Sequence, residues 1–411
     1  MPNILFVSYD GMTDPLGQSQ VIPYLAGLTR YGYQFTILSC EKPEKYHLHK
    51  DHIIKILEPY PIKWVPLFYH KNPPVLSSVF DLMVMKRKAR YLHSKEKFDM
   101  VHTRSGTPAL VGLWMKKKLG VKFLNDIRDF YADSRRDDGS WKETSPIFGR
   151  IYKYFKNKER EEIAQSDGMV CLTHKAEKII KTWPYYKPGA TLKVIPCSVD
   201  LNLFDPDRID IDLKKEFEFR LDLDEDDIVF SYLGSIGGWY LINEMMSFFK
   251  TINDTIQNSK FLFISPNQHE KIYDAASKAG IPIEKIRVTD AQRNEVPVLL
   301  SLSDYSVFFI KSCYSKQASS PTKHGEVMAM GIPVITNSGV GDVADIVKKY
   351  NSGIILEKLT RDDYLKTAQF LSKEDPFERN VIREGAKNYF SLENAVNEYR
   401  NIYDLILKKM D

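Results

Sequence analysis

The segment Ser319–Val343 (SSPTKHGEVMAMGIPVITNSGVGDV) holds a helix start, a strand and a glycine loop in close succession. Ser320 before Pro321 is typical of a helix start, because serine can cap the first N–H groups and proline suits the first helical position. The spacing predicts a helix that stops at Gly331, followed by a strand over 333–336. Helices that alternate with apolar strands in this way indicate an α/β fold with a parallel sheet.

The same alternation runs through the whole chain and restarts near residue 200. We therefore expect two doubly wound parallel-sheet domains, over 1–200 and 201–388. A helix face over 392–410, inside a last segment 389–411, follows from apolar residues three or four apart. The expected strands are 4–8, 35–39, 100–102, 123–126, 168–172 and 193–196 in the first half, and 228–233, 261–264, 286–289, 305–310, 333–336 and 353–356 in the second.

Composition places the 411-residue chain among globular proteins, with 43% hydrophobic and 27% charged residues. The N-terminal MPNILFVSYDG lacks the pattern of a signal peptide, and no apolar run approaches the roughly 20 residues that span a bilayer. The four cysteines are far apart and form no CxxC pair, which is typical of single thiols in a reducing compartment. We expect a cytoplasmic protein that can still lie on the inner face of a membrane.

The net charge of +4 conceals an asymmetry, because the first 200 residues carry +11 and the rest carry −7. The basic run Lys86, Arg87, Lys88 and Arg90 is interleaved with apolar residues. A basic amphipathic helix can bind anionic lipid, although a solvated helix face would have the same sequence. No nucleic-acid motif accompanies the charge, so nucleic acid is not an expected partner.

The helix that starts near Ser320 is a candidate phosphate site, because free N–H groups and the helix dipole attract anions at this end. Lys323 lies in the first turn, where a cation is unfavourable for the helix, and a nearby anion would explain it. Thr322 is a further candidate in the same turn, and Glu326 could accept hydrogen bonds from a ribose. An ordinary capped helix with surface charges remains the alternative.

A second candidate is the glycine-rich turn after the strand 228–233. Gly234, Ser235 and Gly237 would let the backbone approach a phosphate closely. A plain tight turn is equally compatible, because neither a GxGxxG fingerprint nor a Walker lysine is present.

Further candidates follow strands of the first half, where ligands of open α/β sheets bind. Asp126 and Arg128 belong to a charged run after the strand 123–126, which could hold an acceptor or a diphosphate or could be a solvated loop. Gly17 lies in the first loop that enters a helix. The acidic pairs near 210 and 222 lie in a polar connector, and we expect no metal site there.

Taken in order, these segments resemble glycosyltransferase family 4, the retaining GT-B glycosyltransferases. The resemblance runs nearly end to end. It rests on Gly17 and on the stretches 126–128, 195–200 with Phe204, 232–237 and 325–335, of which the last (GEVMAMGIPVI) is the most specific. It implies two Rossmann-like domains facing a cleft, with the acceptor in the first domain, the nucleotide sugar in the second, and the final helix crossing back to the first.

The resemblance also shows where this chain departs from the family. Glu326 matches the second glutamate of the E-x7-E signature, which binds the donor ribose, but the first glutamate falls at Ala318. Many relatives carry an arginine and a lysine after the glycine turn, where this chain has Ser235 and Trp239. The cations for the diphosphate are then expected from Lys323, Lys316 and Arg128.

The resemblance implies an enzyme of the glycosyltransferase class that uses a UDP- or GDP-sugar. A saccharide or lipid-linked saccharide would accept the sugar with retention, without metal or cofactor, in surface polysaccharide biosynthesis. A sugar-nucleotide epimerase of the same fold and a non-enzymatic sugar-binding protein are the alternatives. The candidate catalytic residues are Asp126, Arg128, Lys323 and Glu326, and the candidate nucleotide-sugar residues are Gly17, Gly234, Ser235, Gly237, Ser320, Thr322, Lys323 and Glu326.

Overall fold

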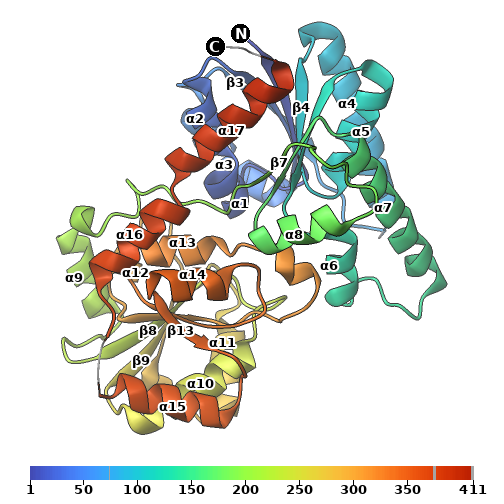
Figure 1. The fold of residues 1–411 in the computed structure, drawn as a ribbon. Coiled ribbons are helices and arrows are strands. Elements are labelled where there is room, and N and C mark those ends of the chain that lie inside the picture. The colour runs from blue at the N-terminus through green and yellow to red at the C-terminus, as the bar shows by residue number, and fades with distance from the viewer. Residues whose placement is uncertain (74, 374–375, 409–411) are drawn as a thin grey trace. The chain divides into compact units, whose positions relative to one another are not determined.

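A computed structural model describes residues 1–73, 75–373 and 376–408. The chain divides into two compact units (Figure 1). The first unit holds residues 1–198 and the C-terminal segment from Leu392, and the second holds residues 199–391. The final helix α17 runs over Leu392–Leu407, and the end expected at Met410 lies outside the described residues.

The first unit is built on a parallel sheet of seven strands in the order β3-β2-β1-β4-β5-β6-β7. Six of these strands were expected, and β3 was missed. Its sequence IKWVPLF contains Pro66, and an edge strand tolerates a residue without an N–H. The strands are β1 (Asn3–Ser8), β2 (Gln34–Glu41), β3 (Ile62–Phe68), β4 (Met100–Arg104), β5 (Lys122–Ile127), β6 (Gly168–Cys171) and β7 (Leu192–Val194).

Alternate residues of β1 face opposite sides of this sheet. Ile4 and Phe6 pack with α2, α3 and α17, whereas Leu5 and Val7 pack with α4 and α5. In Figure 1, α17 accordingly lies beside α2. The helices are α1 (Pro15–Gln20), α2 (Ile22–Thr29), α3 (Pro43–Leu57), α4 (Leu76–Glu96), α5 (Thr107–Leu119), α6 (Tyr131–Asp137), α7 (Pro146–Gln165) and α8 (His174–Thr182).

The second unit has a parallel sheet of six strands in the order β10-β9-β8-β11-β12-β13, with one continuous apolar core. Its strands are β8 (Ile228–Leu233), β9 (Ser259–Ile264), β10 (Ile286–Thr289), β11 (Tyr305–Phe308), β12 (Val334–Asn337) and β13 (Gly353–Leu356). Its α-helices are α9 (Ile211–Arg220), α10 (Ile242–Thr255), α11 (His269–Lys278), α12 (Val296–Leu300), α13 (Thr322–Ala329), α14 (Val343–Tyr350), α15 (Arg361–Leu371) and α16 (Arg379–Tyr389). Three short 3₁₀ helices also occur: η1 (Pro206–Arg208), η2 (Ile283–Lys285) and η3 (Ser315–Ala318).

The strand order reverses once in each sheet. In the first unit the reversal falls between β1 and β4, and in the second it falls between β8 and β11. Loops at the carboxyl ends of the two strands diverge at such a switch point and leave a crevice where ligands bind. The doubly wound α/β expectation is confirmed, and it directs attention to these two strand edges.

Within the described residues, every helix is too short or too polar to cross a membrane.

Candidate active site

In the second unit, the switch point is occupied by the glycine turn that follows β8. Gly234 has φ +121°, and Gly237 and Gly238 also have positive φ, so this backbone path favours glycine. A Cβ atom at Gly234 would lie 3.1 Å from the Nζ atom of Lys323. The structure therefore brings together the two segments that the sequence suggested as separate phosphate sites.

Lys323 is buried beside this turn, with 6% of its surface exposed. Its Nζ atom lies 3.9 Å from the ring centre of Tyr232 and 3.7 Å from that of Tyr240. Among the described residues, Nζ has no hydrogen-bond partner. Burial holds the pKa of Lys323 well below its ordinary value, while the nearby Glu326 raises it. We therefore expect the amine to gain a proton when a ligand binds, because an anion at the turn would favour its protonated form.

Aromatic residues fix this lysine and a second one to the same turn. The Tyr232 hydroxyl donates a hydrogen bond to the Ser235 carbonyl at 2.7 Å, so one side chain contacts both the turn and Lys323. The Nζ atom of Lys316 lies 3.7 Å from the ring centre of Trp239. The rings place both side-chain nitrogens at the turn, and contact with a ring face favours the protonated form of each amine.

The helix α13 begins at Thr322, and Pro321 is its N-cap. The predicted cap at Ser320 is therefore wrong by one residue. Pro321 itself has extended backbone (φ −67°, ψ 121°), and no side chain caps the helix. The first N–H groups of a helix have no partner within the helix, so this end can still bind an anion. Ser320 and Thr322 are both half-buried there.

Glu326 is buried one turn further along α13 and pairs with Arg293. The Arg293 guanidinium also lies 4.7 Å from the Phe204 ring centre. The carboxylate of Glu326 therefore has a second oxygen for a ligand hydroxyl, while Arg293 orients the group. Arg293 was missed, because nothing in its surroundings in the sequence marks it out.

In the first unit, the switch point carries an ion pair that the sequence reasoning also missed. Arg104 at the end of β4 donates from Nε to Oδ2 of Asp10, which follows β1, at 3.1 Å. The two residues are 94 positions apart, so only the strand order could have suggested the pair. Gly17 lies behind this loop, and a Cβ atom there would meet the Gly11 carbonyl oxygen at 2.3 Å. Gly17 thus serves the close packing of α1 against the loop.

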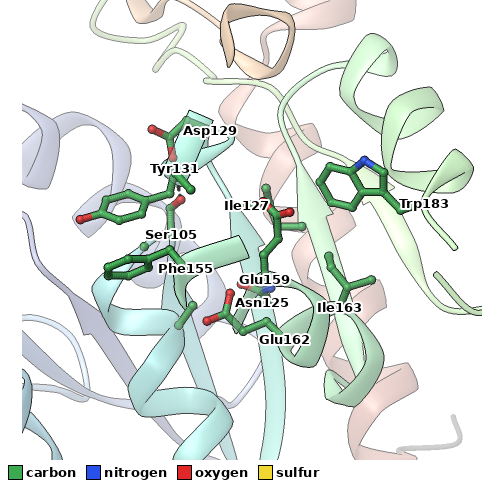
Figure 2. Close-up of a pocket in the computed structure, with 13 residues that line it drawn as sticks. Ser105, Asn125, Ile127, Asp129, Tyr131, Phe155, Glu159, Glu162, Ile163 and Trp183 are labelled. Carbon is green, nitrogen blue, oxygen red and sulfur yellow. Dashed lines mark hydrogen bonds between the residues drawn. The ribbon is translucent and has the colours of Figure 1, made fainter. Parts of the chain in front are cut away.

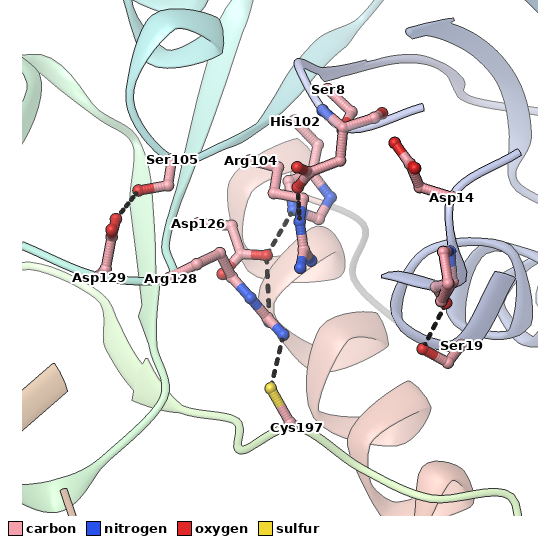
Figure 3. A network of polar contacts seen from close by, with 12 residues as sticks. Ser8, Asp14, Ser19, His102, Arg104, Ser105, Asp126, Arg128, Asp129 and Cys197 are labelled. Carbon is pink, nitrogen blue, oxygen red and sulfur yellow. Dashed lines mark hydrogen bonds and ion pairs between the residues drawn. The ribbon is translucent and has the colours of Figure 1, made fainter. Parts of the chain in front are cut away.

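Asp126 lies in the interior of the same unit, 2% exposed, and Figure 3 shows its surroundings. It accepts a hydrogen bond from the Tyr399 hydroxyl at 3.0 Å, and Nη1 of Arg128 lies 3.4 Å away. Nε2 of His102 lies 3.6 Å from the same carboxylate. Burial opposes ionisation, but the charge of Arg128 and the contact with His102 outweigh it and lower the pKa of Asp126 to about 2.

Arg128 connects this buried network to Cys197 and to the C-terminal helix. Its Nη2 donates to the Cys197 sulfur at 3.3 Å, and Nη1 lies 3.5 Å from the Tyr399 hydroxyl. Because Tyr399 belongs to α17, the Asp126–Arg128 pair fastens the C-terminal helix to β5. Asp126 Oδ2 and the two terminal nitrogens of Arg128 have protein partners, whereas Asp126 Oδ1 and Arg128 Nε have no hydrogen-bond partner among the described residues.

No three histidine, cysteine, aspartate or glutamate side chains lie together in a way that could hold a metal ion, within the part of the chain that the structure describes. Of the predicted site residues, Lys323, Glu326 and the glycine turn belong to the second unit, and Gly17, Asp126 and Arg128 belong to the first.

Two doubly wound parallel-sheet units in one chain, each with polar side chains at its switch point, are the architecture of GT-B glycosyltransferases. Residues 17–203 match the family model described as Glycosyltransferase Family 4, and residues 214–388 match the model described as Glycosyl transferases group 1. The chain belongs to glycosyltransferase family 4, and the expected enzyme class is confirmed.

Known proteins similar to this chain agree with that assignment. The UDP-Gal:alpha-D-GlcNAc-diphosphoundecaprenol alpha-1,3-galactosyltransferase of Escherichia coli is 22% identical over 328 residues, which cover 77% of this chain and 78% of that protein. Sucrose-phosphate synthase from Thermosynechococcus elongatus has a TM-score of 0.75 at 13% identity and covers 100% of both chains. HepE from Anabaena, in complex with UDP and glucose, has a TM-score of 0.71 at 10% identity over 98% of this chain and 100% of that one. At these identities the solved structures show the fold alone.

Proposed function

We propose that this glycosyltransferase moves a hexose from a UDP-sugar to a lipid-diphosphate-linked saccharide, with retention and without a metal ion. The observation that carries the proposal is the buried amine of Lys323 at the glycine turn, which has no hydrogen-bond partner among the described residues. A nucleoside diphosphate supplies the anion that such a site lacks. GDP-sugars are the alternative donors, and the transfer experiment described below compares them with UDP-sugars.

The proposed chemistry places charge stabilisation on protein cations. As the glycosidic bond breaks, negative charge develops on the leaving diphosphate. Lys323, Lys316 and the N-terminus of α13 can stabilise it, and preorganised charge of this kind is a large contribution to catalysis. The acceptor hydroxyl then attacks the oxocarbenium-like sugar from the side of the leaving group and passes its proton to the diphosphate. Glu326, oriented by Arg293, would accept a hydrogen bond from the ribose.

Support for the donor and the acceptor comes from the relatives. The Escherichia coli relative is named for UDP-Gal and a GlcNAc-diphosphoundecaprenol acceptor, and HepE was solved with UDP and glucose. We extend these substrates to the present chain as a proposal, with UDP-galactose as the first donor to test. A role in surface polysaccharide biosynthesis at the cytoplasmic face of the membrane would follow from a lipid-linked acceptor.

The helix α4 supports contact with such a membrane. Leu76, Phe80 and Met83 are exposed on one face of its first turns, and Arg87 and Tyr91 continue that face. Apolar side chains beside cations suit the interface of an anionic bilayer. Flotation with phosphatidylglycerol vesicles at low and high salt tests the contact, with phosphatidylcholine vesicles as control. Equal recovery with both lipids at every salt concentration would argue against it.

The central experiment measures transfer from UDP-galactose, UDP-glucose and GDP-mannose to GlcNAc-diphosphate-lipid. We expect transfer from a UDP-sugar, an α-linked product by NMR, and full activity after EDTA treatment. Loss of activity with EDTA that Mg²⁺ restores would overturn the metal-free mechanism, and a β-linked product would overturn retention. Conversion of the nucleotide sugar without acceptor would indicate an epimerase instead.

A further inference from the structure

A small cavity lies in the first unit, one strand away from the switch point (Figure 2). It is enclosed by the turn after β4, the end of β5 and the helices α6 and α7. Ser105 at its mouth directly follows Arg104, which pairs with Asp10 at the switch point. The Ser105 hydroxyl donates to Asp129 at 2.8 Å and fixes this rim. The cavity is thus part of the ligand-binding edge of the sheet.

The walls of the cavity are aromatic and its inner end is polar. The rings of Tyr131, Phe155 and Trp183 line it, and Tyr131 and Phe155 are 5.1 Å apart between ring centres. Its polar lining includes the Asn125 amide and the Glu162 carboxyl, which are labelled in Figure 2. Asn125 is only 3% exposed.

Neither polar group has a hydrogen-bond partner elsewhere in the described chain, since no hydrogen bond from either side chain to another described residue is found. The neighbouring Glu159, in contrast, pairs with Lys156 and accepts from the Tyr185 hydroxyl. Polar groups that face a cavity without a protein partner are paired by water or by a ligand, so the amide and the carboxyl offer a donor and an acceptor to a group that enters this cavity.

The surroundings of Glu162 favour the protonated form of its carboxyl. Burial is the main cause, with repulsion from Glu159 added, and together they raise its pKa to about 8. A protonated carboxyl both donates and accepts a hydrogen bond, and so does the Asn125 amide. The matching ligand group is therefore neutral and carries its own donor and acceptor.

The size of the cavity limits which ligand groups can fill it. Its volume is about 40 Å³. One water needs roughly 10–15 Å³ on this measure, so about three to four non-hydrogen atoms fit. An acetamido group has four such atoms. Its C=O and N–H match the polar end of the cavity, and its methyl group matches the aromatic walls.

We propose that this cavity binds the acetamido group of an N-acetylated sugar in the acceptor. The inference rests on the proposed function in one respect: it assumes that the acetamido group belongs to the acceptor substrate. It assigns Asn125, Glu162 and the ring of Phe155 to recognition of the sugar's C2 substituent. The inference also predicts that the protein binds free N-acetylglucosamine. This prediction holds even if the proposal of a lipid-linked acceptor is wrong.

The test compares two acceptors that differ only at C2, GlcNAc-diphosphate-lipid and Glc-diphosphate-lipid. For the wild-type enzyme we expect kcat/KM to favour the acetylated acceptor about tenfold or more, as one well-paired polar group provides. Glu162→Leu and Asn125→Leu should each reduce this ratio towards one. Glu162→Gln should preserve the ratio, because a neutral amide keeps a donor and an acceptor. Glu161→Leu, on the same helix but outside the cavity, is the matched control.

Saturation-transfer NMR with N-acetyl-D-glucosamine and with glucose provides a readout independent of turnover. The acetamido methyl should receive the strongest saturation, and Glu162→Leu should abolish it, with melting curves to show that the variant is folded. Equal kcat/KM for both acceptors in the wild type would overturn the inference. So would a kcat/KM ratio between the two acceptors that is unchanged in both leucine variants. Occupation of the cavity by water only would overturn it as well. Absence of transfer to either acceptor with the methyl signal retained would instead contradict the proposed function alone.

Discussion

The Nζ atom of Lys323 lies 3.7 Å from the ring centre of Tyr240, although Lys323 belongs to the first turn of α13 and Tyr240 to the loop before α10. Tyr240 forms an isolated bridge with Ile310, which holds its loop at the end of β11. The ring is therefore a fixed platform for the amine at the switch point. A cation held there needs no large rearrangement to meet a diphosphate.

Replacement of Lys323 by methionine should weaken UDP binding about 10- to 100-fold, because a hydrogen bond to a charged group contributes about 1.5–3 kcal/mol. Isothermal titration calorimetry with UDP measures the change. Methionine keeps the apolar stem, and loss of a buried amine without a partner should leave the melting temperature unchanged or higher. Lys278→Met, at the end of α11, is the control. Unchanged UDP affinity in Lys323→Met would rule out the lysine as the diphosphate cation.

A second prediction moves the charge instead of removing it. In the double variant Tyr240→Lys/Lys323→Met, the new lysine starts on the loop beside Gly234 and can reach the space that Nζ of Lys323 occupied. We expect it to recover about tenfold in UDP affinity over Lys323→Met, which corresponds to about 1.4 kcal/mol.

The control for this exchange is Tyr240→Leu/Lys323→Met, which removes the same ring without adding charge. Recovery in both double variants would show that the ring, and not the position of the charge, limits binding. No recovery in either would mean that the diphosphate lies away from this platform.

The sequence was sufficient to predict most of the fold for a simple reason. Parallel strands that alternate with helices are short, mainly apolar runs, and β8, β10 and β13 were predicted with their observed bounds, although β10 and β13 are partly exposed edge strands. β3, which is also an edge strand, escaped because Lys63 and Pro66 interrupt its apolar run. The start of α13 was displaced because a serine before a proline satisfies the pattern of a cap whether or not its hydroxyl is used.

The site was predictable only where its chemistry is local in the sequence. Lys323 stood out as a cation in the first turn of a helix, and the glycine turn stood out by composition. Their contact, and the rings of Tyr232 and Tyr240 around the amine, depend on strand order. The same holds for the pairing of Arg293 with Glu326, which joins α13 to the segment before α12.

Donor binding should take up a proton at Lys323. In the empty site its pKa lies well below the ordinary value because of burial, and a bound diphosphate would raise it. The unbound amine is therefore neutral over a pH range where the bound amine is charged. The sign follows directly: UDP affinity should fall as pH rises above about 7.5, where the second phosphate ionisation of UDP (near 6) is complete. Titrations in HEPES and Tris, whose ionisation heats differ, count the protons.

The other titratable groups around the amine do not account for this proton uptake, so Lys323 is the group that gains the proton. Glu326 pairs with Arg293, and burial lowers the pKa of His324 to about 3, so that its ring stays neutral. Burial also raises the pKa of Tyr232 above its ordinary value, and Lys316 lies against Trp239. Lys323→Met should thus abolish the uptake. Persistent uptake in that variant would assign the proton to another group.

The last prediction concerns the attachment of α17. Tyr399 donates to the buried Asp126 carboxylate at 3.0 Å, and Tyr399→Phe removes this donor while the ring remains. A hydrogen bond to a buried charge contributes about 1.5–3 kcal/mol, so the melting temperature should fall by roughly 3–12 °C at pH 7. Tyr91→Phe, on the exposed face of α4, should change it little.

The pH dependence of this difference tests the charge on Asp126. Its pKa is lowered to about 2 by Arg128 and His102 against the effect of burial. A carboxyl with a depressed folded-state pKa stabilises the protein above its unfolded value near 3.9, and this stability is lost as pH falls through the folded value. The gap between wild type and Tyr399→Phe should therefore narrow as pH falls from about 4 to 2, because Asp126 is increasingly protonated in both proteins as pH approaches the folded value. A constant gap across this range in thermal melts would show that Tyr399 acts through packing and not through the charge of Asp126.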